Sequence, residues 1–330
     1  MIKVDVTRHL DPEMAAAIAE SQRLYGEIVA ERGPVAPDDL DGQRASYNHE
    51  RAFWNAIRPA LAAVEPLEIQ GPGGAIPCRL YRPSNARPLP ALVYFHGGGW
   101  ILGNLDTHDR IMRLLAEKSG AAVLGVDYRL APEHKFPAAY DDALAAVEHL
   151  RRNGAALGID AARLALGGDS AGANLSLATW LQLRPEARAS IRCLLLYYGA
   201  FGLADSPSRR AFGNELDGLT KEDLERYRAC LVRGPADLAD IRLDCLAGDL
   251  RGLPPSFIAA SALDPLLDDS LALAQLLGEV GVAHELVVYE GVLHGFLHLS
   301  RMVAKATQAL DAGAAALKQA SPSPGFATPR

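Results

Sequence analysis

Between residues 91 and 289 the chain alternates apolar runs of strand length with stretches of helical composition, and this alternation limits the possible folds more than any other feature. Most runs are continuously apolar, which is typical of strands buried on both faces. Such strands, joined by crossover helices, predict an α/β fold with a mostly parallel, doubly wound central sheet flanked by helices. The six predicted strands are Ala91–Phe95, Ala121–Val126, Arg163–Leu166, Ile191–Tyr198, Ser256–Ala262 and His284–Tyr289.

Four further elements are predicted before this alternation begins. Leu67–Gln70 and Ile76–Tyr81 flank a glycine-rich turn and predict an antiparallel hairpin at the sheet edge. Helices are predicted over Pro12–Arg32, with Asp11 as its cap, and over Gln43–Ile57. The apolar face of the second helix is formed by Phe53, Trp54 and Ile57. Because a large exposed aromatic face is a liability, we expect residues 1–58 to pack over the body as part of a cap.

The alternation is interrupted once, by a loop-rich and charged insertion at residues 199–253. It leaves from the carboxyl end of a predicted strand, the side on which open α/β sheets bind ligands. Within it, Thr220 with Asp223 three residues later predicts a capped helix over Thr220–Leu231. We expect the insertion to complete the cap, with residues 59–198 and 254–320 forming the α/β domain and 321–330 a disordered tail.

One strand end carries a serine in a glycine-rich turn, Gly168-Asp169-Ser170-Ala171-Gly172, which leads into a stretch of helical composition. A serine on such a turn is held in a strained backbone conformation with its hydroxyl exposed. The flanking glycines are required because a Cβ would collide with the neighbouring strand or helix. Ser170 is therefore the candidate nucleophile, and the alternative is a strand-to-helix turn without chemistry.

A serine hydroxyl becomes a nucleophile when a base takes its proton and a third group orients that base. His294 follows a strand end in a short loop and is the predicted base. His284 opens the same strand at the wrong edge, and His298, one helical turn further, is equally explained by a structural role.

The predicted orienting acid is Asp264, which comes directly after the strand Ser256–Ala262. Asp268 and Asp269 follow where the next helix begins, and we interpret them as N-terminal caps and partners of the helix dipole. Three chemically matched side chains at three strand ends are not explained by a turn without chemistry.

The loop His96-Gly97-Gly98-Gly99-Trp100 follows the first long parallel strand. Its glycines let backbone N–H groups approach a tetrahedral oxygen, so Gly98, Gly99 and Ala171 are the predicted oxyanion donors. A dinucleotide site is excluded because the G-x-G-x-x-G spacing is missing. We interpret His96 and Gly97, together with Asp169, as residues that support this loop.

The motifs taken together resemble the hormone-sensitive-lipase-like family of α/β-hydrolases. The resemblance spans about residues 60 to 320, and Asp217-Gly218-Leu219-Thr220 narrows it to the bacterial acetyl esterases of that family. It implies an α/β-hydrolase fold with a helical cap, and a carboxylesterase for short acyl chains in which Ser170, Asp264 and His294 are catalytic. Ala173 and Trp100 depart from common family residues, which leaves the shape of the acyl pocket open. The motifs that carry the resemblance are His96–Trp100, Asp127–Glu133, Gly168–Gly172, Asp264–Leu266 and His294–Phe296.

The remaining composition limits partners and location. A net charge of −7 without a basic stripe argues against nucleic acid or an anionic membrane as the main partner. The partner that the family resemblance implies is a small-molecule ester substrate. No apolar run approaches membrane-spanning length and no secretory leader is recognisable, so we expect a cytoplasmic protein, either monomer or homodimer. No cofactor or metal is expected. Four cysteines without C-x-x-C spacing are interpreted as reduced thiols: Cys78, Cys193, Cys230 and Cys245.

Two alternatives stay open from the sequence. The same nucleophile could hydrolyse an amide, such as an N-formylated aryl amine. A hydrolase fold that has lost its catalytic activity could also serve as a small-molecule or protein-binding module, since fold does not determine function.

Overall fold

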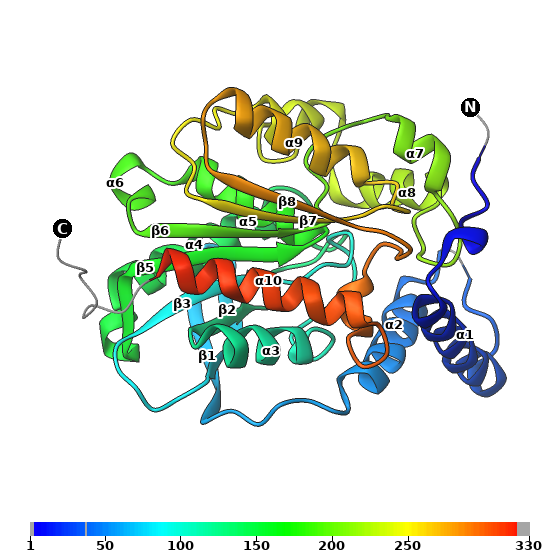
Figure 1. Ribbon diagram of the computed structural model, residues 1–330, viewed down its shortest axis with the longest axis horizontal. Coiled ribbons are helices and arrows are strands. Elements are labelled where there is room, and N and C mark those ends of the chain that lie inside the picture. The colour runs from blue at the N-terminus through cyan, green and yellow to red at the C-terminus, as the bar shows by residue number, and fades with distance from the viewer. Residues whose placement is uncertain (1–2, 37, 322–330) are drawn as a thin grey trace.

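The computed structural model describes residues 3–36 and 38–321. The predicted disorder of 322–330 therefore lies outside the described residues. Within them an eight-stranded sheet lies between two layers of helices (Figure 1). Its strands, in chain order, are β1 Ala63–Gly71, β2 Gly74–Arg82, β3 Leu89–Phe95, β4 Ala122–Val126, β5 Ile159–Asp169, β6 Ile191–Tyr197, β7 Ser256–Ser261 and β8 His284–Tyr289.

The strand order across the sheet is β1-β2-β4-β3-β5-β6-β7-β8. β1 pairs antiparallel with β2, and β2 antiparallel with β4, whereas every pairing from β4 to β8 is parallel. The predicted edge hairpin and the mostly parallel sheet are thus confirmed. β5 is longer than the predicted Arg163–Leu166 because its pairing with β6 continues through Gly167 and Gly168 to Asp169.

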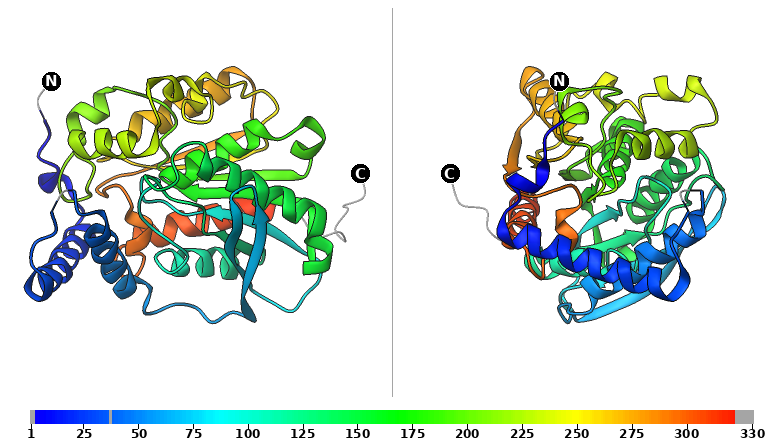
Figure 2. Two further views of the ribbon diagram at one scale, coloured as in Figure 1. Left: turned by 180° about the vertical axis from the view of Figure 1, so that it is seen from behind. Right: turned by 90° about the vertical axis from the view of Figure 1, so that its right-hand side faces the viewer.

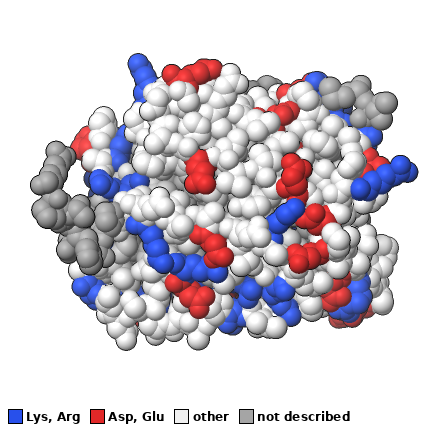
Figure 3. All heavy atoms as spheres, in the orientation of Figure 1, with Lys and Arg blue, Asp and Glu red and all other residues white. Residues whose placement is uncertain are grey.

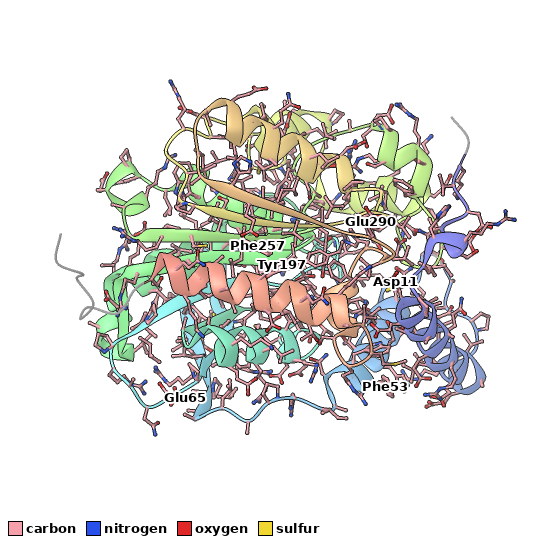
Figure 4. All side chains as sticks on the ribbon, in the orientation of Figure 1. Asp11, Phe53, Glu65, Tyr197, Phe257 and Glu290 are labelled. Carbon is pink, nitrogen blue, oxygen red and sulfur yellow. The ribbon has the colours of Figure 1, made fainter. Side chains whose placement is uncertain are left out.

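The two faces of the sheet are covered by different helices (Figures 1 and 2). α3 (Asp109–Ser119) and α10 (Ala304–Ala320) cover one face. On the other lie α4 (Ala138–Asn153), α5 (Ala171–Gln182) and α9 (Leu267–Glu279), while the short α6 (Pro185–Arg188) leads into β6. Tyr197 and Phe257 fill the layer between the sheet and α10, with ring centroids 6.0 Å apart (Figure 4). Continuous apolar strands therefore bury both faces, as expected for crossover topology.

α1 (Pro12–Arg32) and α2 (Leu40–Asn55) lie at the end of the molecule where the parallel strands terminate (Figures 1 and 2). The first matches its prediction, but the Asp11 side chain does not cap it. That carboxylate instead lies 2.5 Å from Lys305 Nζ, which also donates to the Glu290 carbonyl (Figure 4). α2 buries Trp54 completely, whereas Ile57 lies beyond the helix end and is 64% exposed, so its assignment to the apolar face was wrong.

The insertion contains α7 (Pro207–Phe212) and α8 (Lys221–Leu231) and lies at the same end of the molecule. α8 carries the predicted capping box, with Thr220 and Asp223 satisfying each other's backbone N–H groups. The cap roles of Asp268 and Asp269 were wrong, because α9 starts at Leu267 with Leu266 at its cap position. Asp268 accepts the Ser208 amide instead, and Asp269 accepts three amides at residues 201–203.

The exterior carries interspersed charges of both signs on the face drawn in Figure 3. No helix in the described part of the chain is both long and apolar enough to span a bilayer. All four cysteines are free thiols, and Cys230 alone of them is not fully buried.

Candidate active site

Ser170 occupies a sharp turn between β5 and α5. Its backbone φ is +55° and ψ is −118°, a conformation that residues other than glycine rarely adopt. The Ser170 amide donates to the Tyr197 carbonyl of β6 at 2.9 Å, which fixes the turn against the sheet. A Cβ at Gly172 would lie 1.9 Å from the Phe95 carbonyl oxygen, so the expected collision with the neighbouring strand is confirmed.

The structure brings Ser170, His294 and Asp264 into one hydrogen-bonded chain. The Ser170 hydroxyl lies 2.9 Å from His294 Nε2, and His294 Nδ1 lies 2.7 Å from Asp264 Oδ2. Asp264 is fully buried, and its other oxygen accepts the Leu266 amide at 2.7 Å. Because ionised Asp264 accepts only, Nδ1 carries the proton and Nε2 is free to accept from the serine.

The protonation of His294 is governed by opposing effects. Burial alone lowers its pKa, but the charge of Asp264 and the hydrogen bond to it outweigh burial, with smaller support from Asp217. The net result is a pKa above the ordinary histidine value. The Tyr198 ring packs edge-on against the imidazole, with centroids 4.8 Å apart, and limits its rotation.

Three backbone amides are the candidates for an oxyanion site next to the serine. Gly98 and Gly99 line the cavity that contains Ser170, and Ala171 is the first residue of α5. Among the described residues none accepts a hydrogen bond from the N–H groups of Gly98, Gly99 or Ala171. Gly99 also allows close packing, since a Cβ there would lie 2.9 Å from the Tyr227 ring. These amides have the chemistry of an oxyanion site.

The remaining predicted site residues support the glycine loop through hydrogen bonds and ring stacking. Asp169 accepts the Tyr94 hydroxyl at 2.7 Å and the Gly97 amide at 3.1 Å. The His96 ring stacks on Tyr128, with ring centroids 4.3 Å apart, and its Nδ1 hydrogen bonds to the Gly97 carbonyl at 2.8 Å. Burial lowers the pKa of His96 to about 3, so this side chain stays neutral.

A buried cluster of His108, His298 and Asp169 has the close spacing that metal ligands require. However, the Gly97 amide donates to His108 Nε2 at 3.2 Å, which occupies the lone pair that a metal would need. Burial and then the nearby Arg51 guanidinium hold the pKa of His298 well below its ordinary value. A second cation is unfavourable beside Arg51, so the cluster fits a structural role better than a metal site.

A cavity of about 860 Å³ opens above Ser170 and His294. Its walls come from α1, α2, the glycine loop and the 199–253 insertion, with Trp100 among the lining residues. Trp180 and Phe201 are buried in the core cluster on one face of the sheet, Phe212 packs against the other cluster, and none of the three lines the cavity.

Sequence reasoning missed His108, Tyr94 and Tyr227 as contacts of the site. Tyr94 lies inside a buried strand, where its apolar ring gave no sign of a hydroxyl directed at Asp169. His108 lies in the loop after Trp100 and Tyr227 in the middle of α8, and no residue spacing marks either as a partner of the glycine loop.

A model of the family described as alpha/beta hydrolase fold matches residues 92–298, which include all three hydrogen-bonded side chains. Two curated relatives are both named acetyl esterase. The protein from Salmonella choleraesuis strain SC-B67 is 42% identical, and that from Salmonella typhi 40% identical, each over 318 residues. Both alignments cover 94% of this chain and 95% of the relative.

Solved structures of similar proteins extend the comparison. A hyperthermophilic esterase from the archaeon Pyrobaculum calidifontis has a TM-score of 0.85 at 34% identity, covering 94% of this chain and 98% of that one. An ester hydrolase from the Lake Arreo metagenome, complexed with a bipyridine phosphonate derivative, has a TM-score of 0.86 at 36% identity with the same coverage.

Proposed function

Because this chain belongs to the hormone-sensitive-lipase-like family of α/β-hydrolases, we propose that it is a serine carboxylesterase that hydrolyses short-chain acyl esters, such as acetyl esters. The observation that carries the proposal is the Ser170–His294–Asp264 chain, with hydrogen bonds of 2.9 and 2.7 Å beside three unengaged amides. The helices α1 and α2 and the 199–253 insertion serve as its cap, since they wall the cavity above the serine.

In the first half-reaction His294 Nε2 takes the hydroxyl proton as Ser170 Oγ attacks the ester carbonyl carbon. The carbonyl oxygen becomes an oxyanion within reach of the Gly98, Gly99 and Ala171 amides. Collapse of this intermediate breaks the bond to the alcohol oxygen, which receives the proton from His294. The alcohol leaves, and the acyl group stays on Ser170.

In the second half-reaction water takes the place of the alcohol. His294 removes a proton from the water as its oxygen attacks the acyl carbon, and then returns that proton to Ser170 Oγ when the carboxylic acid departs. Asp264 stabilises the imidazolium in both halves and keeps Nε2 directed at the serine.

The proposal is tested by Ser170→Ala with p-nitrophenyl acetate as substrate. We expect turnover to fall by several orders of magnitude with the fold intact, because the nucleophile is lost while the oxyanion amides remain. Ser190→Ala is the matched control, since its hydroxyl bonds to the Ala187 carbonyl and takes no part in the cavity. Hydrolysis retained by a clean Ser170→Ala preparation would refute the role of Ser170.

Chain length and bond type are tested with the native enzyme. A series of p-nitrophenyl esters from acetyl to palmitoyl should show kcat/KM highest for the short chains; a maximum at long chains contradicts the acyl preference. An aryl formamide measured alongside the aryl acetate separates ester from amide hydrolysis, and faster cleavage of the formamide would reverse the assignment.

A further inference from the structure

Asp217 is a carboxylate of the cavity wall that has no counter-ion among the described residues. Asp217 lies on the loop Gly213–Leu219 of the insertion and lines the cavity together with Ser170 and His294. Its oxygens accept two long hydrogen bonds, from the Leu219 amide at 3.2 Å and from Asn214 Nδ2 at 3.3 Å. Among the described residues no Lys, Arg or His nitrogen lies within 4.0 Å of this carboxylate. A partly buried carboxylate whose lone pairs lack hydrogen-bond donors has an unfavourable free energy. A donor from a bound molecule would remove this penalty.

The loop holds Asp217 in a fixed place. Asn214 Oδ1 accepts the Leu216 amide at 2.8 Å, and its Nδ2 also donates to the Phe212 carbonyl at 2.9 Å. The Tyr227 hydroxyl donates to the Gly218 carbonyl at 3.2 Å, while the ring of Tyr227 packs on Gly99. The carboxylate is therefore positioned relative to the oxyanion amides by α8, which carries Tyr227.

Asp217 and His294 line the same cavity, and each affects the pKa of the other. Burial raises the pKa of Asp217 to about 7, and the charges that act on it most strongly are those of His294 and Asp264. Asp217 in turn raises the pKa of His294. Asp217 therefore shares the cavity with the imidazole that gives its proton to the leaving alcohol oxygen in ester hydrolysis.

We propose that Asp217 is the hydrogen-bond acceptor of a subsite for the alcohol portion of the ester, and that it selects alcohols bearing a further hydroxyl group near the ester oxygen. The inference rests on the proposed esterase function and names a substrate class for it: acetyl esters of diols and polyols. A neutral hydroxyl fits better than a cationic group, because His294 becomes positively charged beside this subsite during each half-reaction.

The test compares two esters that differ by one group, 2-hydroxyethyl acetate and propyl acetate. The ratio of the two kcat/KM values is divided by the ratio of the hydroxide-catalysed rates, which corrects for the intrinsic reactivity of the esters. This corrected ratio should favour 2-hydroxyethyl acetate about ten-fold in the native enzyme, because one hydrogen bond to a carboxylate has about this effect. Asp217→Ala should bring this ratio close to one. Asp217→Asn, which keeps one acceptor oxygen and the side-chain size, should retain part of it.

Glu222→Ala is the matched control, since it removes an exposed carboxylate five residues away, in the first turn of α8 and outside the cavity lining. Its substrate ratio should equal that of the native enzyme; a loss equal to that of Asp217→Ala would assign the effect to the general negative charge of the insertion and overturn the proposal. If Asp217→Ala does not fold, the substrate ratios of the native enzyme and of Asp217→Asn are compared instead. A ratio in Asp217→Asn that lies between the native value and one supports the proposal, and a native ratio of one overturns it.

Two further substrate pairs separate the alternatives. A larger preference for acetylcholine over 3,3-dimethylbutyl acetate would make the subsite a cation site and overturn the hydroxyl assignment. An Asp217-dependent preference for methyl glycolate over methyl propionate would place it on the acyl side and overturn the alcohol assignment. A native enzyme that hydrolyses propyl acetate through Ser170 but shows no hydroxyl preference contradicts this inference alone, whereas no hydrolysis at all contradicts the proposed function.

Discussion

The pairing of Asp264 with His294 couples a buried carboxylate to the proposed base for Ser170. Asp264 is fully buried, and its two oxygens bind the imidazole and one backbone amide. The pair therefore holds the ring in one tautomer and raises the pKa of His294 against the opposing effect of burial. Since a base must be neutral to accept a proton, this raised pKa sets the pH below which activity is lost.

We expect kcat/KM for p-nitrophenyl acetate to rise with pH as His294 loses its proton, with a midpoint above the ordinary histidine pKa of 6.5. Asp264→Asn removes the negative charge that stabilises the imidazolium, so the midpoint should move to lower pH while kcat falls by about 10⁴. Rate profiles from pH 5 to 9 measure both. A midpoint that stays in place in Asp264→Asn would show that the Asp264 charge does not control His294.

At the scale of elements, hydrophobic spacing and caps were enough to locate helices and strands but not to assign their polar residues. The predicted Pro12–Arg32 helix and the Thr220 capping box are both observed. Asp269 was misassigned because a carboxylate in the first turn of a helix has the same sequence pattern whether it caps that helix or binds a distant loop. Only the folded insertion supplies the amides that Asp269 accepts.

Asp269 is the main polar link between α9 and the start of the insertion. One oxygen accepts the amides of Phe201, Gly202 and Leu203 at 2.7, 3.0 and 3.2 Å, and the other accepts Arg209 at 2.9 Å. The side chain is fully buried, and that of Arg209 is 11% exposed. These bonds fix the segment through which the chain enters the 199–253 insertion.

Asp269→Ala should therefore lower the free energy of unfolding by about 3–5 kcal/mol, because it leaves a buried guanidinium and three amides without their acceptor. Urea unfolding measures the loss, and limited proteolysis should show earlier cleavage within residues 199–213. Asp268→Ala is the control: it removes the acceptor of a single amide, that of Ser208, and should cost about 1 kcal/mol. Equal losses in the two variants would contradict the linking role of Asp269.

At the scale of the whole molecule, the sequence predicted the residues of the site, but it did not predict the strand order or the contacts between loops around the site. Parallel strands end at one edge of a sheet, so residues just after strand ends, such as Asp264 and His294, could be expected to lie near Ser170. The strand order could not be predicted, since strands buried on both faces carry similar apolar sequences. Contacts between loops, such as His108 with Gly97, leave no periodic signal and emerge only in the fold.

The cavity exists because separate segments are held against the α/β body. Arg44 of α2 makes the largest polar contact between them, donating to the carbonyls of Ile101 at 2.9 Å and Ala131 at 3.0 Å. Two further bonds, of 2.6 and 2.9 Å, join its guanidinium to both carboxylate oxygens of Glu133. Glu133 and Ala131 belong to the Asp127–Glu133 motif, so one part of this motif anchors α2, while its Tyr128 stacks on His96 and donates to the His96 carbonyl.

Arg44→Ala should loosen α2 while leaving the Ser170–His294–Asp264 geometry in place, because those three residues lie on the α/β body. Since α2 supplies Tyr47, Glu50 and Arg51 to the cavity wall, we expect KM for p-nitrophenyl acetate to rise about ten-fold with kcat changed less than three-fold. Hydrogen exchange should accelerate in α2 and not in β5 or β6.

Arg23→Ala controls for the loss of an arginine from the N-terminal helices, since within residues 3–36 and 38–321 Arg23 pairs only with Glu20 and Glu27 on the exposed side of α1. Exposed pairs of this kind contribute little to stability, so its KM should match that of the native enzyme. If Arg44→Ala lowered kcat and left KM and α2 exchange unchanged, Arg44 would act on the reacting groups themselves, through the Ile101 carbonyl beside the glycine loop. A rise in KM accompanied by faster exchange in α2 makes the position of this helix the determinant of substrate binding.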